Sequence, residues 1–509
     1  MLRNSTSIAA AAALLVALTA MPAVHAAPVG EFTDYGDVGT PQNAGRTTYN
    51  ASSQEYVLSG SGTNMWGTKD EFHYAWRKLS GDFILQARVT FVGAGVEAHR
   101  KAGWIVRSSL DADAPYVSAA VHGDGLISQQ TRATQGGETT EVVSPAKGAD
   151  MIQLERRGNT YLFSAARFGE PYQTTQIELD AGAEPYIGLF VCAHNPQVIE
   201  QAVFSNVRII RPAKADFVPY RDYIGSHLEL LDAQTGTRQL IYSSRVPFEA
   251  PNWTADGSAL VYNSSGNDPA TRGRLYRFDL QRRQPTLIDT GFAIRNNNDH
   301  VLSMDGTMQG ISDQSTDAGQ STIFVLPARG GVPKRITPLT PSYLHSWSPD
   351  GKYLLYTGGR NGNFDIYRAA SDGSGKEMRL TTHAAVDDGP EFTPDGQYIY
   401  FNSARTGSMQ IWRMKPDGSE QTQITHDEYN NWFPHISPDG KSMVIISYAE
   451  PIKADDHPYY KRVYLRLLPL AGGTPKVIAY IYGGQGTINV PSWSPDGRML
   501  AFVSNSDQR

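Results

Sequence analysis

The stretch Ser346-Trp-Ser-Pro-Asp-Gly351, followed by KYLLYTGG, decides the fold because the chain repeats it. Related copies recur through the C-terminal half, and their aspartates are Asp256, Asp305, Asp350, Asp395, Asp439 and Asp496. The intervals between successive aspartates are 49, 45, 45, 44 and 57 residues. A period near 45 residues, with several strands in each repeat, is typical of a β-propeller. We therefore predict a propeller over residues 225–509.

Each repeat predicts four strands. In the clearest copy, the first strand ends at Trp347, and Asp350-Gly351 forms a hairpin turn in which glycine adopts a positive φ at no steric cost. Residues 353–356, 364–369 and 377–381 supply the other three strands. The repeated aspartates are then turn residues, and the repeated tryptophans belong to the core between blades.

The two ends of the repeat region complement each other. The last copy, at Ser492, has only two strands before Arg509, whereas residues 226–243 supply a third and a fourth strand with no first and second. Pairing these pieces gives six whole blades. It also closes the ring by hydrogen bonds between N-terminal and C-terminal strands.

Residues 28–212 lack the repeat and show alternating strand patterns between Gly, Asp and Pro turns. The expected strands are residues 56–61, 83–91, 103–109, 116–122, 150–156, 161–168, 186–193 and 203–210. So many strands in one segment predict a two-sheet β-sandwich of jelly-roll type. Residues 213–224 are the expected linker, and the whole chain is predicted to be all-β.

Residues 1–26 have the pattern of an export signal. Arg3 precedes an apolar run over residues 8–20, and Val24-His25-Ala26 fits a cleavage site for small residues. The apolar run is short for a membrane span. We expect a periplasmic or secreted protein that is not inserted in a membrane.

Composition and motifs exclude several classes of function. The net charge of −6 lacks the basic excess that a nucleic-acid-binding surface needs. The single cysteine, Cys192, excludes a disulfide scaffold. The chain contains no G-x-S-x-G, P-loop, G-x-G-x-x-G, H-E-x-x-H or C-x-x-C motif. No cofactor is therefore required by any motif.

The repeats resemble the propeller of the TolB family over about residues 225–509. The resemblance rests on Trp-Ser-Pro-Asp-Gly at residues 347–351 and 493–497 and on the strand endings RIT and QIT. It implies a six-bladed propeller in an exported binding protein, because TolB-family proteins are periplasmic components of the Tol system. That family carries an α/β domain where this chain predicts a β-rich one.

The N-terminal half is similar to concanavalin-like sandwich domains. The similarity rests on FILQARV at residues 83–89, on KAGWIVR at residues 101–107, and on Gln129 with Arg132. Since such domains are associated with carbohydrate-active proteins, this resemblance implies glycan binding.

Residues that the repeat does not require are expected at one mouth of the propeller channel, where the links entering each first strand gather. The predicted ligand-binding residues there are Arg245, Glu249, Arg295, Asn298, Asp299, His300, Tyr343, His345, Asp387, Asp388, Asn431, Trp432 and Asn489. Aromatic faces stack on sugar rings, while amide and charged groups form hydrogen bonds with them. This mixture of side chains is suited to a polar ligand such as a glycan.

Two of these residues, His300 and His345, occupy the same position in successive repeats. The other four copies carry Pro251, Pro390, Pro434 and Pro491 at that position. Two imidazoles at equal height on adjacent blades are candidate ligands for a divalent metal ion, with Asp299, Asp387 or Asp388 as the third ligand. The simpler interpretation is that both histidines are hydrogen-bonded structural residues.

The function favoured by the sequence is that of an exported binding protein. It would bind a protein partner or a glycan in the funnel that these residues form at the mouth of the channel. The alternative is a carbohydrate-active enzyme, either a polysaccharide lyase or a glycoside hydrolase, with its site in the same funnel. A similarity to oligogalacturonate-lyase-like propellers implies a metal-assisted lyase in which Arg245 or Arg295 binds a uronate carboxylate. A hydrolase needs an acid/base pair, for which the candidates are Glu249, Asp299, Asp387 and Asp388. A scaffold without a ligand is the third hypothesis.

Only an enzyme requires a pair of carboxyl groups with perturbed pKa values in the funnel. The sequence assigns no catalytic residue.

Overall fold

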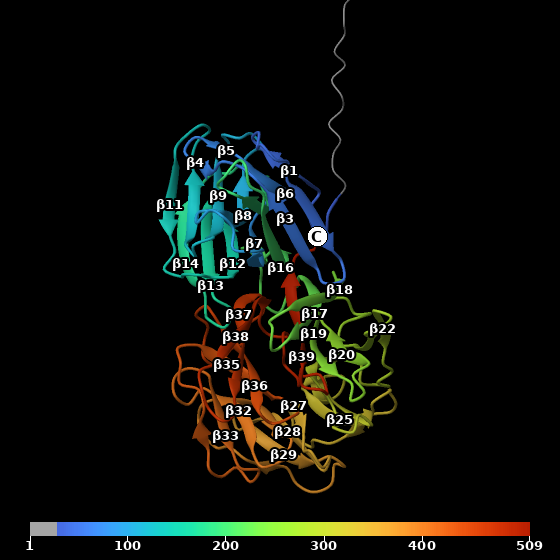
Figure 1. The fold of residues 1–509 in the computed structure, drawn as a ribbon. Coiled ribbons are helices and arrows are strands. Elements are labelled where there is room, and N and C mark those ends of the chain that lie inside the picture. The colour runs from blue at the N-terminus through green and yellow to red at the C-terminus, as the bar shows by residue number, and fades with distance from the viewer. Residues whose placement is uncertain (1–27, 509) are drawn as a thin grey trace, which may run out of the picture.

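A computed structural model describes residues 28–508, so the predicted export signal lies outside the described residues. Within that range the chain is all-β, and its one helical element is the three-residue 3-10 turn Asp317–Gly319. The N-terminal sheets are stacked on a ring of C-terminal sheets (Figure 1). In the described part of the chain, no helix combines the length and the apolar character needed to cross a bilayer.

Two antiparallel sheets of seven strands form the N-terminal part. In spatial order, the first contains β1 (Asp34–Val38), β6 (Phe72–Lys78), β15 (Tyr186–Cys192), β8 (Lys101–Arg107), β9 (Tyr116–His122), β10 (Ile127–Arg132) and β11 (Thr139–Val143). The second contains β14 (Gln173–Glu178), β13 (Thr160–Ala166), β12 (Met151–Arg157), β7 (Phe83–Phe91), β16 (Glu200–Ile210), β3 (Glu55–Gly60) and β2 (Arg46–Asn50). A small ribbon joins β4 (Met65–Trp66) to β5 (Lys69–Asp70).

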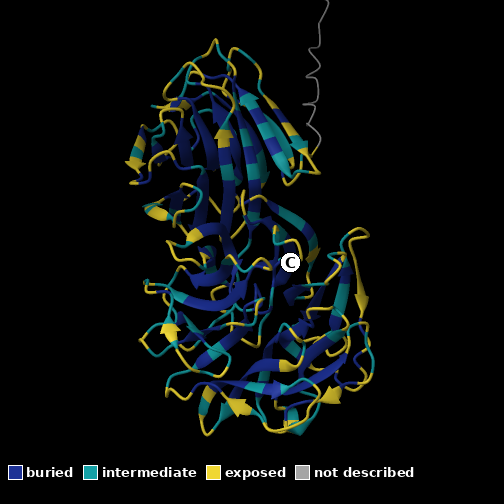
Figure 2. Cartoon of the chain, turned by 60° about the horizontal axis from the view of Figure 1, so that its bottom comes forward, coloured by how far each residue is buried: buried dark blue, intermediate teal, exposed yellow. Residues whose placement is uncertain are grey.

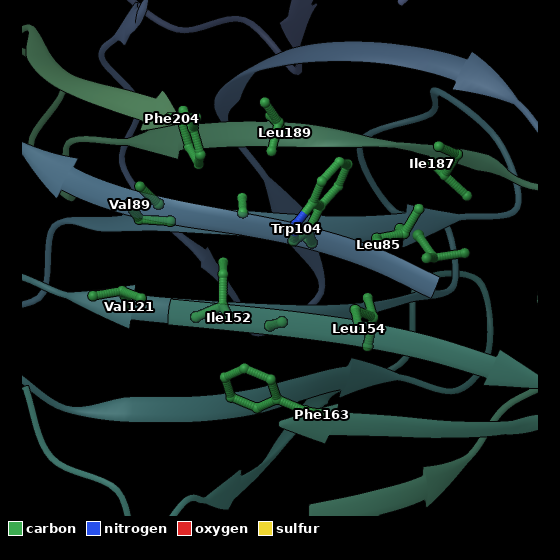
Figure 3. Close-up of a cluster of buried hydrophobic side chains, with 14 of the residues drawn as sticks. Leu85, Val89, Trp104, Val121, Ile152, Leu154, Phe163, Ile187, Leu189 and Phe204 are labelled. Atoms are coloured by element: carbon green, nitrogen blue, oxygen red, sulfur yellow. The ribbon is translucent and has the colours of Figure 1, made fainter. Parts of the chain in front are cut away.

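The two sheets share one apolar core. Trp104 of β8 is fully buried and packs with Leu85 of β7, Ile152 of β12 and Leu189 of β15 (Figure 3). Arg107, three residues further along β8, is also fully buried but is bonded to Asp70, at 2.6 Å. Strand alternation thus assigns the tryptophan to the core and the arginine to a buried ion pair.

The sequence patterns missed all four edge strands of this part. β1 and β11 are the edges of the first sheet, and β2 and β14 are the edges of the second. β14 has an almost wholly solvent-facing burial pattern. Edge strands bury less apolar surface, so their alternation is weaker in the sequence. The internal strand β6 was also missed.

The C-terminal part is a six-bladed propeller. Five sheets have four strands each: β19 (Phe248–Trp253), β20 (Ala259–Ser264), β21 (Leu275–Asp279) and β22 (Gln284–Leu287); β23 (Asn296–Leu302), β24 (Met308–Asp313), β25 (Thr322–Pro327) and β26 (Lys334–Arg335); β27 (Ser342–Trp347), β28 (Tyr353–Arg360), β29 (Asn363–Ala370) and β30 (Met378–Arg379); β31 (Asp387–Phe392), β32 (Ile399–Ser403), β33 (Gln410–Met414) and β34 (Thr422–Gln423); β35 (Asn430–Ile436), β36 (Ser442–Tyr448), β37 (Lys461–Pro469) and β38 (Lys476–Gly483). Figure 2 shows buried residues along the blade strands and exposed residues mainly on the loops.

The sixth blade confirms the predicted closure. β17 (Gly225–Asp232) pairs along its whole length with β39 (Met499–Ser506), and β18 (Arg238–Ser244) follows at the outer edge. A bridge between Trp493 and Leu500 adds the innermost segment. Strands from both ends of the propeller segment therefore hold the ring together.

The repeated aspartates stabilise their own turns. In the clearest copy, Ser348 Oγ and the Lys352 amide donate hydrogen bonds to Asp350 Oδ1, at 2.6 and 3.1 Å. These bonds lower the pKa of Asp350 to about 2. Gly351 has a φ of +71°, which the turn requires. Trp347 Nε1 donates to the Val301 carbonyl of the preceding blade, at 2.9 Å, so the motif also connects blades.

A buried charge cluster connects the sandwich to the propeller. Arg208 of β16 and Arg238 of β18 both donate to the Glu229 carboxylate of β17, at distances from 2.6 to 3.1 Å. Ser504 Oγ donates a further bond to Glu229, at 2.5 Å. Glu229 is fully buried, and the two arginines hold its pKa well below the usual range against the effect of burial.

Candidate functional site

The first strand of each complete blade is interrupted by a bulge near the same end. The register shifts between Glu249 and Asn252, Asn296 and His300, Leu344 and Ser346, Asp388 and Glu391, and Trp432 and His435. A bulge leaves residues unpaired in the ladder and re-aims their side chains. Ala250 and Phe433 lie in two of these bulges and have φ values of +58° and +51°. Such left-handed conformations are strained in residues other than glycine and are frequent at functional sites.

Residues at the bulges of β23, β27, β31 and β35 line a cavity of about 440 Å³ at this mouth of the channel. Its aromatic lining residues are Tyr220, Tyr343, Phe364, Trp432 and Phe433. Its amide side chains are Asn297, Asn298, Gln314, Gln485 and Asn489. Its titratable residues are Asp299, His345, Asp388, Asp455 and His457.

A second cavity, of about 540 Å³, adjoins the first. Both are lined by Tyr220, Asn297, Asn298, Gln314 and Gln485. The second adds Tyr223, Glu249, Arg272, Arg295 and Tyr459. We call the two adjoining cavities the funnel.

Asp388 is held as an anion in the first cavity. Its Oδ1 accepts hydrogen bonds from Thr357 Oγ1 at 2.6 Å and from the Gly389 amide at 2.8 Å, and it lies 3.0 Å from His345 Nε2. Burial opposes ionisation, but the bond and charge of His345 outweigh it and lower the pKa of Asp388 to about 2. Asp388 in turn raises the pKa of His345 against the effect of burial.

Asp299 lines the same cavity, but its pKa is shifted in the opposite direction. Burial raises the pKa of its carboxyl group to about 7. The positive charge of His345 opposes that shift, while the negative charges of Asp388 and Glu249 add to it. Two carboxyl groups on one cavity therefore have pKa values on opposite sides of the usual value, the arrangement found in acid/base pairs.

Several buried polar atoms on the cavity wall have no partner within the described chain. They are Trp432 Nε1, His457 Nδ1 and Gln485 Oε1. Trp432 is only 1% exposed. An unpaired buried polar group costs about 1–3 kcal/mol, so a ligand that pairs with it gains binding free energy. These atoms favour a polar ligand.

The funnel contains most of the residues predicted from the sequence. Asn298, Asp299, Tyr343, His345, Asp388, Trp432 and Asn489 line the first cavity, and Glu249 and Arg295 line the second. Four predicted residues lie elsewhere, namely Arg245, His300, Asp387 and Asn431. Arg245 is exposed and lines neither cavity, Asp387 is paired with Arg405 at 2.9 Å, and Asn431 is buried against Arg466 and Ser447.

The structure does not bring His300 and His345 together. His345 lies within the bulge of β27 and lines the cavity, whereas His300 remains in the β23 ladder opposite Ile311. The ring of His300 instead lies with Nε2 3.3 Å from the Val261 carbonyl of the neighbouring blade. Among residues 28–508, no group of three or more His, Cys, Asp or Glu side chains is arranged to hold a metal ion. The two histidines share a position in the repeat but not in the structure, because the bulge of β23 ends before His300 whereas the bulge of β27 contains His345.

Two loops that cover the funnel were not predicted from the sequence. The linker contributes Tyr220, and the connection between β36 and β37 contributes Asp455 and His457. These loops meet where Tyr220 Oη donates to Asp456 Oδ1, at 3.3 Å. The 57-residue interval, longer than the other four, was a signal for the second loop. No repeat covers the linker, so the sequence held no comparable signal for Tyr220.

Comparisons with known proteins agree with the propeller. The family model described as the TolB beta propeller domain matches residues 345–456. An uncharacterized protein of Agrobacterium fabrum is 44% identical over 279 residues, which are 55% of this chain and 92% of the relative.

A solved structure gives the same result. A protein from Agrobacterium tumefaciens, provisionally named TolB, is 44% identical, with a TM-score of 0.52 over 56% of this chain and 99% of that one. TolB from Acinetobacter baumannii is more distant, at 16% identity and a TM-score of 0.38 over 64% of this chain and 80% of that one. Because the chain covers nearly the full length of relatives 44% identical to it, it belongs to the family of TolB-like β-propeller proteins.

Proposed function

We propose that this chain is an exported binding protein whose funnel holds a segment of a glycan. The observation that carries the proposal is the funnel wall, where aromatic rings, amides and unpaired buried polar atoms occur together. A protein partner is the other ligand class expected of a TolB-like propeller.

The wall is chemically suited to sugars. Tyr343 and Phe364 lie with ring centroids 6.3 Å apart on the first cavity, and Trp432 lies on the same wall. Aromatic faces stack on the apolar faces of sugar rings, while amides such as Asn298 and Asn489 bind hydroxyl groups. The two cavities, of about 440 and 540 Å³, are each within the usual size range of small-ligand sites.

Two further parts of the proposal rest on the pattern of residues 1–26 and on the N-terminal sheets. Export to the periplasm or to the exterior rests on residues 1–26. A concanavalin-like character of the N-terminal sandwich is supported by its two packed seven-stranded sheets and would give the protein a second glycan-contacting part.

Binding of the full mature chain to immobilised oligosaccharides and to immobilised periplasmic peptides tests the proposal. We expect saturable binding to one group of oligosaccharides, weakened at least about tenfold in Tyr343→Ala. Tyr343 is half-buried on the cavity wall, so its replacement removes ring contact with little effect on the fold. Binding to peptides alone would show that the funnel binds a protein partner. Glycan binding by Tyr343→Ala as tight as that of wild type would contradict the funnel as the glycan site.

A further inference from the structure

We propose that the funnel not only binds a glycan but hydrolyses a glycosidic bond in it, with Asp388 as nucleophile and Asp299 as proton donor. This inference rests on the proposed glycan binding and adds a reaction to it. Both carboxyl groups line the first cavity, and each affects the ionisation of the same histidine, His345.

Asp388 is oriented as a nucleophile requires. Thr357, Gly389 and His345 all contact Oδ1, and among residues 28–508 the other oxygen, Oδ2, makes no hydrogen bond. The carboxylate is therefore fixed through one oxygen while the other is available to form a bond. His345 is a positioning residue that also keeps Asp388 ionised.

Asp299 is suited to the complementary role. It lies in the bulge of β23 and is 5% exposed, and burial is the main cause of its raised pKa. Because its pKa is about 7, the carboxyl group can carry a proton near neutral pH and donate it. Its backbone amide is fixed by Asn297 Oδ1, at 3.1 Å.

Asp387, the immediate neighbour of Asp388, shows why position matters. Its carboxylate is satisfied by both bonds from Arg405 and lies outside the funnel. Strand alternation sends adjacent side chains to opposite faces, so one aspartate serves the fold and the other faces the ligand.

The reaction balances in two steps. In the first, Asp388 Oδ2 bonds to the anomeric carbon as the glycosidic C–O bond breaks, and the Asp299 proton passes to the departing oxygen. In the second, a water oxygen bonds to the anomeric carbon and the bond to Asp388 breaks. The ionised Asp299 takes a proton from that water, which regenerates both carboxyl groups. The anomeric configuration is retained.

The test uses α- and β-nitrophenyl glycosides of glucose, galactose, mannose, xylose, N-acetylglucosamine and glucuronate, beside the disaccharide matching any glycoside cleaved. Nitrophenolate departs without a proton, whereas a sugar hydroxyl needs one. Asp299→Asn should therefore lose about 10³-fold in kcat/KM on the disaccharide and much less on the nitrophenyl glycoside. Asp388→Asn should lose about 10³-fold or more on both.

A 2-deoxy-2-fluoro glycoside of the same sugar should label Asp388, detected by mass spectrometry of the digested protein. The matched control is Asp395→Asn, which removes a turn carboxylate of the same blade, and should leave both rates unchanged; melting temperatures confirm that all variants fold. Equal losses of Asp299→Asn on the two substrates, inversion of configuration, or labelling elsewhere overturns the assigned roles. No cleavage of any glycoside overturns hydrolysis but leaves glycan binding standing, whereas failure of the oligosaccharide binding test removes both.

Discussion

The molecule contains a buried cluster of charge at the junction between sandwich and propeller and another in the funnel. Only at the junction are both oxygens of the carboxylate paired. At the junction, Glu229 is bonded by two arginines and a serine, so both of its oxygens are satisfied. In the funnel, Asp388 is bonded through one oxygen. Asp299 lines the same cavity, and the positive charge that acts on it comes from His345.

This difference separates structural charge from functional charge. Removing charges from water is costly, and a buried ion is tolerated when hydrogen bonds and counter-charges compensate it. The junction meets that condition internally, whereas the funnel leaves polar atoms of Trp432, His457 and Gln485 unpaired. Burial alone does not identify a site; incomplete pairing beside a cavity does.

The largest effect on stability is expected at the junction. Glu229→Gln leaves Arg208 and Arg238 buried without a carboxylate, and arginine cannot release its proton. We expect a loss of about 3–5 kcal/mol in the free energy of unfolding, measured by denaturant titration. A loss below about 1 kcal/mol would show that the cluster is solvated. It would also remove the difference between the junction and the funnel.

Asp299→Asn should raise the free energy of unfolding rather than lower it, by an amount that depends on pH. In the folded chain the pKa of Asp299 is about 7, against 3.8 for an unperturbed group, so unfolding releases its proton between those values. Wild-type stability is therefore lost as pH rises from about 4 to 7. The variant should be more stable than wild type by roughly 2–4 kcal/mol at pH 8 and by almost nothing at pH 4. The same difference at both pH values contradicts a protonated Asp299.

Asp388→Asn should lower the free energy of unfolding by about 1–2 kcal/mol at pH 8, which is less than the loss expected for Glu229→Gln. Its partner is a histidine, which can lose its proton when the carboxylate is removed, whereas the arginines of the junction cannot. The check is the difference between the two losses in the same denaturant titration. Equal losses would mean that the funnel carboxylate is as structural as Glu229.

Arg245→Ala is expected to change stability by no more than about 0.5 kcal/mol. Arg245 is exposed and belongs to neither cluster, although its sequence position predicted a place in the funnel. Thermal unfolding beside wild type checks this. A clear loss would reveal a contact of Arg245 in solution.

Repetition explains why the propeller was predictable and its site only partly so. The spacing of the six Asp-Gly turns determines the blade number, and the incomplete strand sets at residues 226–243 and 492–509 determine the closure. The links before each first strand pointed to Asp299, His345 and Asp388 because those residues break the repeat. The prediction that His300 and His345 lie together failed because it depended on bulge geometry. The two residues share a position in the repeat, but the register shifts differently around them.

Features that involve both parts of the chain were not predictable. The Glu229 cluster joins four strands from the two parts, and Tyr220 reaches the funnel from a segment expected only to connect them. No periodic pattern marks such contacts, since they depend on how the parts are placed in space.

The measurement that tests the central claim most directly is calorimetric titration of the best-binding oligosaccharide into wild type, Tyr343→Ala and Arg245→Ala. Tyr343 lies on the funnel wall, and Arg245 lies outside it. We predict at least about tenfold weaker binding by Tyr343→Ala, equivalent to roughly 1.4 kcal/mol, and an unchanged Kd for Arg245→Ala. Equal affinities of all three proteins, or a loss confined to Arg245→Ala, would contradict the funnel as the ligand site.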